Sequence, residues 1–261
     1  MQLATTEYGT NAAAPPVLIV HGLFGSARNW TAIARGLSAA RRVITVDLRN
    51  HGNSGHAPSH TYADMAGDLA GVIAECGGQA DVIGHSMGGK VAIALALGHP
   101  GCVRGLVVAD IAPVAYGHSQ IHLIDALRAV DLSRITTRRA ADVALGARVP
   151  EAGVRAFLLQ SLDIGAKRWR LNLEVLAAFM PDIIGWPDPP GQFAGPALFL
   201  SGGESDYVRA EHRGAIRAQF PRARFAKLPG AGHWLHADRP REFAAAVEAF
   251  LRALGPGGAG C

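Results

Sequence analysis

Short runs of β-branched and aliphatic residues alternate with helix-like stretches along most of this chain. The runs are the candidate strands Val17–Val20, Arg42–Val46, Asp81–Gly84, Val103–Ala109, Ala197–Leu200 and Arg224–Leu228. Helical patterns between them cover Thr61 to Glu75, Ser86 to Leu97, Arg209–Gln219 and Pro240–Leu254, with Thr61 and Asp238 as candidate N-caps. Repeated strand–helix–strand units predict an α/β fold with a mostly parallel sheet, because parallel neighbours need a crossover connection.

The segment from Pro113 to Pro190 interrupts this alternation. It shows no convincing strand and has helix-like stretches at Ser119–Val130, Thr137–Leu145, Pro150–Leu159 and Arg170–Phe179. Proline and glycine then crowd into Ile184–Gly195, which indicates a linker returning to the sheet. A separate small domain is the alternative, but the strand–helix series resumes afterwards, which favours a lid. We therefore predict an α/β core of residues 1–112 and 191–261 and a helical cap of residues 113–190.

Composition excludes several classes of protein. Hydrophobic residues make up 49% of the 261 and charged residues 18%, which supplies a core and excludes a disordered chain. No apolar stretch reaches the ~18 residues of a membrane span, and the start MQLATTEYGT carries no Sec-type signal. Three cysteines without metal-like spacing, Cys76, Cys102 and Cys261, favour a cytoplasmic location. The net charge of +4 comes from scattered arginines, so nucleic acid is not an expected partner.

The pentapeptide Gly84-His-Ser-Met-Gly88 has the form G-x-S-x-G, directly after a candidate strand and directly before a helix. A serine on so sharp a turn adopts strained dihedral angles, and small neighbours avoid a collision there. The helix N-terminus adds partial positive charge and free amides beside the hydroxyl. The alternative is an ordinary glycine-rich helix cap, but the strand–turn–helix context favours Ser86 as a nucleophile.

The segment His21-Gly-Leu-Phe-Gly25 follows an earlier candidate strand. A loop at this place can direct a backbone N–H at an acyl oxygen that becomes negative. We assign the two donors to the Met87 and Leu23 amides, with Phe24 as the near alternative. A plain strand-to-helix turn is the competing interpretation, and His21 itself is better suited to bracing the loop.

A serine nucleophile needs a base, because its own pKa is far too high for it to ionise at neutral pH. Among eleven histidines, His233 stands out in the glycine-rich loop Gly230-Ala-Gly-His-Trp234, between the last candidate strand and the last helix. Its place matches the chain order Ser…Asp…His of this kind of site. His236 is the serious competitor. Four other histidines lie on loops elsewhere and are expected to be solvated or structural: His51, His56, His60 and His99.

Two aspartates end strands on the correct side to orient His233. Asp110 closes the run Leu106-Val-Val-Ala109, and Asp206 follows the next strand in Gly203-Glu-Ser-Asp206. Spacing alone does not separate them.

Other polar segments point to supporting roles. The loop Asp47–Gly55 is expected to be fixed by hydrogen bonds. The alternative is that Arg49 or His51 contacts the substrate. Lys90, one turn into the helix after Ser86, is expected to be solvated or packed without a chemical role. The chain has no Walker loop, dinucleotide fingerprint or zinc-spaced cluster, so we predict neither a cofactor nor a metal.

Five segments together, HGLFGSARNW, DLRNHGNSGH, GHSMGGKVA, VVADIAPVAY and AGHWLHADRP, resemble the α/β-hydrolase superfamily. More narrowly they resemble the YbfF-type esterases, relatives of the abhydrolase-domain-containing esterases. The resemblance covers nearly the whole chain. It implies a sheet of about eight strands, a helical cap over the C-terminal strand edges, and ester or thioester hydrolysis without a cofactor. It also implies that the D-I-A-P aspartate, Asp110, is the acid, whereas Asp206 matches the G-x-x-D form of many wider-superfamily members.

The resulting hypothesis is a serine esterase in which Ser86 attacks a small acyl ester or thioester and His233 takes its proton. A thioesterase or carbon–carbon bond hydrolase is the same-fold alternative. A small-molecule receptor with a residual triad is the alternative of another class. Large apolar side chains are expected to line an acyl-binding site: Phe24, Ile121, Leu123, Phe157, Phe179, Met180, Trp186 and Trp234. The alternative is that these side chains pack the insertion against the core. The oligomeric state is not predicted.

Overall fold

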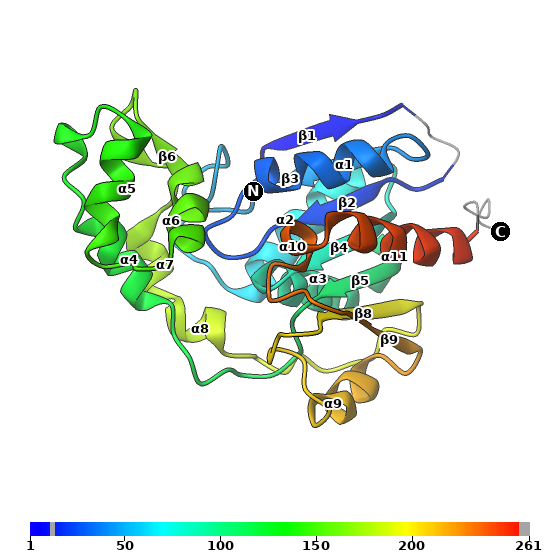
Figure 1. The fold of residues 1–261 in the computed structure, drawn as a ribbon. Coiled ribbons are helices and arrows are strands. Elements are labelled where there is room, and N and C mark those ends of the chain that lie inside the picture. The colour runs from blue at the N-terminus through cyan, green and yellow to red at the C-terminus, as the bar shows by residue number, and fades with distance from the viewer. Residues whose placement is uncertain (11–13, 256–261) are drawn as a thin grey trace.

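A seven-stranded sheet forms the centre of the computed structural model, which describes residues 1–10 and 14–255 (Figure 1). The strand order is β1-β3-β2-β4-β5-β8-β9. Its strands are β1 (Thr5–Tyr8), β2 (Val17–Val20), β3 (Val43–Val46), β4 (Ala80–His85), β5 (Val103–Ala109), β8 (Ala197–Gly202) and β9 (Ala223–Leu228). Only β1 runs antiparallel to its neighbour, and the remaining pairs are parallel. The predicted α/β fold with a mostly parallel sheet is confirmed.

The number of strands differs from both expectations. The residue patterns indicated six strands, all of which are present, and the family resemblance implied about eight. The sequence pattern missed β1 because Thr5–Tyr8 is polar and lies exposed at the sheet edge, so it lacks a buried alternation. Within the described residues the sheet has seven strands, one fewer than the resemblance implied.

Alternate residues of the central strands pack into two separate hydrophobic cores, one on each face of the sheet. Leu18 and Val20 of β2 point to one face, which α2 (Tyr62–Glu75), α3 (Met87–Gly98) and α9 (His212–Gln219) cover. Val17 and Ile19 point to the other face, which α1 (Thr31–Leu37) and α11 (Pro240–Ala253) cover. Burial on both faces is why these strands are continuous apolar runs.

The helix caps agree with expectation at one helix and differ at another. Thr61 caps α2, with its hydroxyl accepting a hydrogen bond from the Asp64 amide at 3.2 Å. Asp238 does not cap α11, because it ends a short preceding helix, α10 (Leu235–Asp238). Its carboxylate instead accepts from the Gly232 amide at 2.9 Å, inside the loop that carries His233.

The chain between β5 and β8 forms a helical insertion, drawn in green and yellow-green at one side of the sheet (Figure 1). Its helices are α4 (Ile121–Arg128), α5 (Arg138–Gly146), α6 (Ala152–Leu158), α7 (Leu173–Ala178) and α8 (Met180–Ile184). The expectation of no strand here is wrong: β6 (Leu162–Asp163) pairs with β7 (Arg168–Trp169). Each has two residues, too few to show an alternating pattern.

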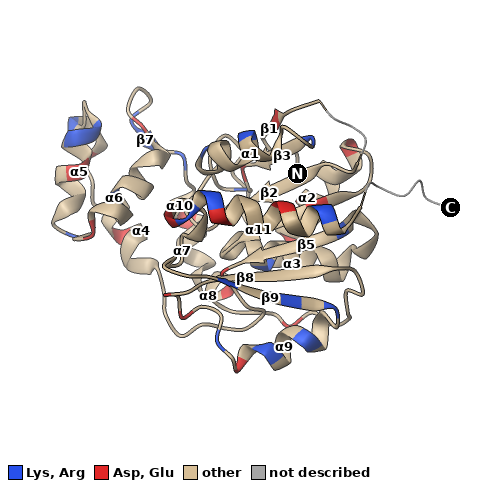
Figure 2. Ribbon diagram, turned by 45° about the vertical axis from the view of Figure 1, so that its right-hand side comes forward, with Lys and Arg blue, Asp and Glu red and all other residues tan. Residues whose placement is uncertain are grey.

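Charged residues are spread over the core and the insertion. Figure 2 shows basic residues on α5 in the insertion and on α9 and β9 in the core. No helix within the described residues is long and apolar enough to cross a membrane.

Candidate active site

Ser86 lies on the turn between β4 and α3 with φ +53° and ψ −124°. The turn requires glycine on both sides. A Cβ at position 84 would lie 2.3 Å from the Gly88 carbonyl oxygen, and one at position 88 would lie 2.3 Å from the His21 carbonyl oxygen. The G-x-S-x-G pattern therefore reflects the close approach of two backbone segments beneath a strained serine.

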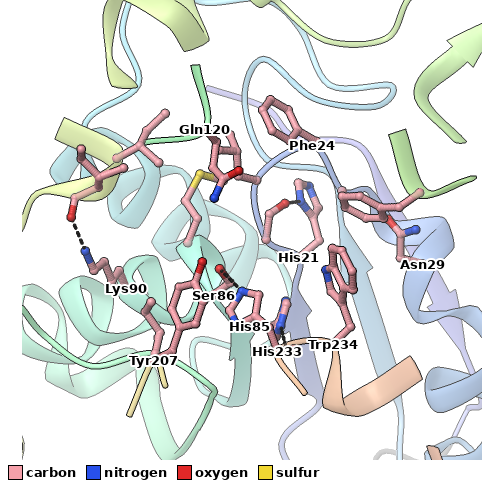
Figure 3. Close-up of a pocket in the computed structure, with 18 of the residues that line it drawn as sticks. His21, Phe24, Asn29, His85, Ser86, Lys90, Gln120, Tyr207, His233 and Trp234 are labelled. Carbon is pink, nitrogen blue, oxygen red and sulfur yellow. Dashed lines mark hydrogen bonds between the residues drawn. The ribbon is translucent and has the colours of Figure 1, made fainter. Parts of the chain in front are cut away.

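His233 lies between Ser86 and Asp110. Figure 3 shows His233 beside Ser86. The Ser86 Oγ is 2.9 Å from His233 Nε2, and His233 Nδ1 is 2.8 Å from Asp110 Oδ2. A carboxylate only accepts, so Nδ1 donates to Asp110 and Nε2 is left to accept from the Ser86 hydroxyl. The His85 Nε2–H group donates to the His233 carbonyl at 2.8 Å and fixes its backbone.

Asp110 is completely buried at the end of β5, with φ +52°. Its Oδ1 accepts from the Gly202 amide at 2.9 Å, and its Oδ2 accepts from the Ser205 hydroxyl as well as from His233. A buried carboxylate needs such partners, because an unpaired charge away from water is costly.

The two competing residues lie elsewhere. The Asp206 side chain is exposed and makes no hydrogen bond or ion pair with His233, and the Asp206 carbonyl accepts from Arg209 Nε at 3.2 Å. His236 stacks on Trp30, with ring centroids 4.1 Å apart and 15° between the planes. Burial lowers the pKa of His236 to about 3, so it remains a neutral packing residue.

The backbone amides of the glycine-rich loop after β2 differ in whether they already have an acceptor. The Phe24 amide donates to His51 Nε2 at 3.2 Å, whereas the Leu23 and Met87 amides meet no acceptor in the part of the chain that the structure describes. His21 braces this loop, because its Nε2 accepts from the Leu48 amide at 3.0 Å. The geometry thus leaves Leu23, rather than Phe24, available as a donor.

A cavity of about 340 Å³ opens above Ser86. Of the eight apolar candidates, Phe24, Leu123, Phe157 and Trp234 line it. The other four do not: Ile121, Phe179, Met180 and Trp186. Ile121 is exposed at the start of α4, and Met180 is buried in the hydrophobic core, so the faces of α4 and α8 that meet the cavity belong to neighbouring residues.

Sequence reasoning missed several residues that line the cavity. They come from the start of α2, from α3, from the insertion and from the loop after β8: Tyr62, Lys90, Tyr116, His118, Gln120, Ile183, Ile184 and Tyr207. No local signal identifies them, because their position depends on how the insertion packs against the core.

Lys90 is buried rather than solvated, with 1% of its surface exposed. Its Nζ donates to the Ile184 carbonyl at 3.1 Å and to the Gly185 carbonyl at 2.6 Å. Burial lowers its pKa to about 7. Lys90 therefore connects α3 to the end of α8 through these two hydrogen bonds.

The polar loop after β3 has the structural role expected for it. Asp47 accepts from the Ala27 amide at 2.7 Å and from the Asn53 amide at 2.8 Å. Arg49 pairs with buried Asp68 at 2.6 Å, and neither Arg49 nor His51 lines the cavity. Within the described residues, no three His, Cys, Asp or Glu side chains gather as a metal site requires.

Buried neutral histidines predict that the protein loses stability in acid. Burial lowers the pKa of His21 to about 4, and those of His51 and His236 to about 3. Below pH ~6.5 the unfolded chain binds protons that the folded chain does not, so the free energy of unfolding falls as the pH falls. At pH 5 each such histidine costs about 2 kcal/mol relative to neutral pH.

The measurement is the urea midpoint of unfolding at pH 7.5 and pH 5.0, which we expect to be clearly lower at pH 5.0. His236→Phe keeps a ring on Trp30 and should reduce the difference, whereas replacing exposed His99 by glutamine should not. Equal midpoints at the two pH values would contradict this account.

Residues 17–246 match the model of the alpha/beta hydrolase family, and the chain belongs to that family. Among curated relatives, the sn-1-specific diacylglycerol lipase ABHD11 of Mus musculus is 42% identical over 252 residues, 92% of this chain and 82% of the relative. The esterase YbfF of Escherichia coli (strain K12) is 41% identical over 239 residues, 90% and 92% of the two chains.

Among solved structures, a marine microorganism esterase superposes with a TM-score of 0.91 at 35% identity, covering 95% of this chain and 99% of that one. These comparisons confirm the predicted family and enzyme class, an esterase-type hydrolase.

Proposed function

We propose that this chain is a serine hydrolase that cleaves carboxylic acyl esters through an acyl-enzyme intermediate. The observation that carries the proposal is the continuous contact from Ser86 Oγ to His233 Nε2 and from His233 Nδ1 to Asp110 Oδ2, at 2.9 and 2.8 Å. Nucleophile, base and orienting acid are within hydrogen-bond reach of one another, and the first two, Ser86 and His233, line one cavity.

In the proposed reaction, Ser86 Oγ attacks the acyl carbon while His233 Nε2 takes its proton. The resulting imidazolium faces the Asp110 carboxylate. The bond from the acyl carbon to the alcohol oxygen then breaks, and Nε2 returns the proton to the departing alcohol. Water, deprotonated by the same histidine, attacks the acyl carbon of the acyl-enzyme. The bond from that carbon to Ser86 Oγ then breaks, Nε2 returns the proton to Oγ, and the carboxylic acid departs.

The proposed oxyanion hole consists of the Met87 and Leu23 amides. Both lack an acceptor among the described residues, and Met87 is the first residue of α3, where the helix dipole favours negative charge. The bond from the Phe24 amide to His51 removes the alternative donor.

The proposed substrate is a small ester with an apolar acyl group. The insertion, taken as a cap of residues 113–190, contributes Leu123, Val154 and Phe157 to the cavity, and the core of residues 1–112 and 191–261 contributes Phe24 and Trp234. The relatives named as an esterase and a diacylglycerol lipase support an acyl ester over other substrates.

Continued turnover of p-nitrophenyl butyrate is the expected result for the purified protein, and a series of acyl lengths should define the chain that fits the cavity. The same series on acyl-CoA thioesters compares ester with thioester. The measurement is release of p-nitrophenol, or of free CoA, over many equivalents of protein. A single burst without further turnover would indicate a binding protein and contradict the proposal.

A further inference from the structure

The loop after β8 places two neighbours of Asp206, rather than Asp206 itself, against the candidate base and acid. The Ser205 hydroxyl donates to Asp110 Oδ2 and accepts from the Tyr207 amide at 3.3 Å. The ring of Tyr207 lies on the His233 imidazole, with centroids 3.8 Å apart and 17° between the planes. In the G-x-x-D segment, the residues on either side of the aspartate, Ser205 and Tyr207, therefore contact the candidate acid and base.

Tyr207 is held in place from the insertion side as well. Its hydroxyl hydrogen-bonds His118 Nε2 at 2.8 Å, and its carbonyl accepts from the Tyr116 hydroxyl at 2.7 Å. The Tyr116 hydroxyl in turn accepts from the Ala112 amide at 2.9 Å. Tyr207, half-buried at the cavity wall, thus has its ring, hydroxyl and backbone fixed (Figure 3).

We propose that Tyr207 is a positioning residue for His233. The bond to Asp110 restrains one atom of the imidazole, but the ring plane can still tilt about the side-chain torsions. A parallel aromatic ring restrains that plane, so Nε2 stays directed at Ser86 Oγ while Nδ1 stays on Asp110.

The stacked ring also favours the protonated base. When His233 takes the Ser86 proton it becomes a cation, and the face of a tyrosine ring attracts a cation within about 6 Å of its centroid. This inference rests on the proposed function, because it assigns Tyr207 a role in the same proton transfer. His118 and Tyr116 act only by holding Tyr207.

Two variants separate the ring of Tyr207 from its hydroxyl. Tyr207→Phe keeps the stacked ring and loses the bond to His118, so we expect a kcat within about threefold of the original protein. Tyr207→Leu removes the ring, and we expect kcat on p-nitrophenyl butyrate to fall about tenfold, on the scale of an aromatic or cation–π contact.

A spectroscopic signal distinguishes positioning from simple packing. The proton shared by an imidazole Nδ1 and a carboxylate gives a far-downfield proton resonance, which Asp110→Asn should abolish and thereby assign. We expect this resonance to stay sharp in Tyr207→Phe and to broaden in Tyr207→Leu, because the imidazole moves. Phe157→Leu, which removes another ring from the same cavity, should leave it sharp.

The outcomes separate this inference from the proposed function. If the original protein turns over the ester while Tyr207→Leu keeps both its kcat and a sharp resonance, Tyr207 does not position His233. If Tyr207→Phe is as impaired as Tyr207→Leu, the hydroxyl and not the stacked ring is responsible, which also overturns the inference. Absence of turnover in the original protein would contradict the proposed function itself. Circular dichroism melting checks that each variant is folded.

Discussion

Replacing Asp110 by asparagine is expected to lower kcat for ester hydrolysis by up to ~10⁴-fold. The asparagine amide can donate to Nδ1, which would leave the proton on Nε2 and prevent it from accepting from Ser86. The variant also lacks the negative charge that faces the imidazolium. Asp110 is positioned for this role because it is completely buried, and its Oδ2 lies 2.8 Å from Nδ1 of His233.

Asp206→Asn is the matched control, because Asp206 follows the next strand along the chain but is exposed and makes no hydrogen bond with His233. Its kcat should stay close to that of the original protein, measured on the same ester at the same pH. A collapse in Asp206→Asn with Asp110→Asn nearly unaffected would reverse the assignment of the acid. Partial losses in both would mean that the two carboxylates share the task.

Ser86→Ala is expected to reduce turnover by roughly 10³-fold or more, because only the oxyanion donors and substrate binding remain. The fold should be unchanged, since alanine is smaller than serine and the Ser86 hydroxyl hydrogen-bonds only His233, while the backbone bond from Ser86 to the Ala109 carbonyl is kept. Steady-state release of p-nitrophenol measures the loss, and Ser38→Ala, at the end of α1, is a control serine outside the cavity. Undiminished turnover in Ser86→Ala would exclude Ser86 as the nucleophile.

Ser86 and His233 could be proposed from the sequence because each lies in a short segment whose backbone requirements are visible locally. Gly84 and Gly88 are needed for close backbone approach at the turn between β4 and α3. The glycines before His233 indicate a loop between the last candidate strand and the last helix. The choice between Asp110 and Asp206 is different. Both follow strands, and only the packing of the loop after β8 decides which carboxylate turns inward.

The residues that line the cavity could be predicted only in part. Ile121 and Leu123 lie two positions apart on α4, yet only Leu123 lines the cavity. Met180 is buried in the core, whereas Ile183, less than one turn further along α8, reaches the cavity. Apolar composition alone does not show which face of a short helix meets the core and which meets a substrate.

Lys90 shows the same limit for a charged residue. A lysine one turn into a helix is usually solvated, and nothing nearby in the sequence indicates that it is buried. Its acceptors, the carbonyls of Ile184 and Gly185, come from the far end of the insertion. The interaction exists only once the insertion has packed against α3.

The central claim, that Ser86 is activated by His233 as a nucleophile, is tested most directly by a fluorophosphonate that reacts covalently with activated serines. After labelling, proteolysis and mass spectrometry locate the adduct. The account predicts one adduct per chain, on the peptide that contains Ser86, and none in Ser86→Ala or His233→Ala. An adduct on another serine, or continued ester turnover in protein that the probe does not modify, would contradict it.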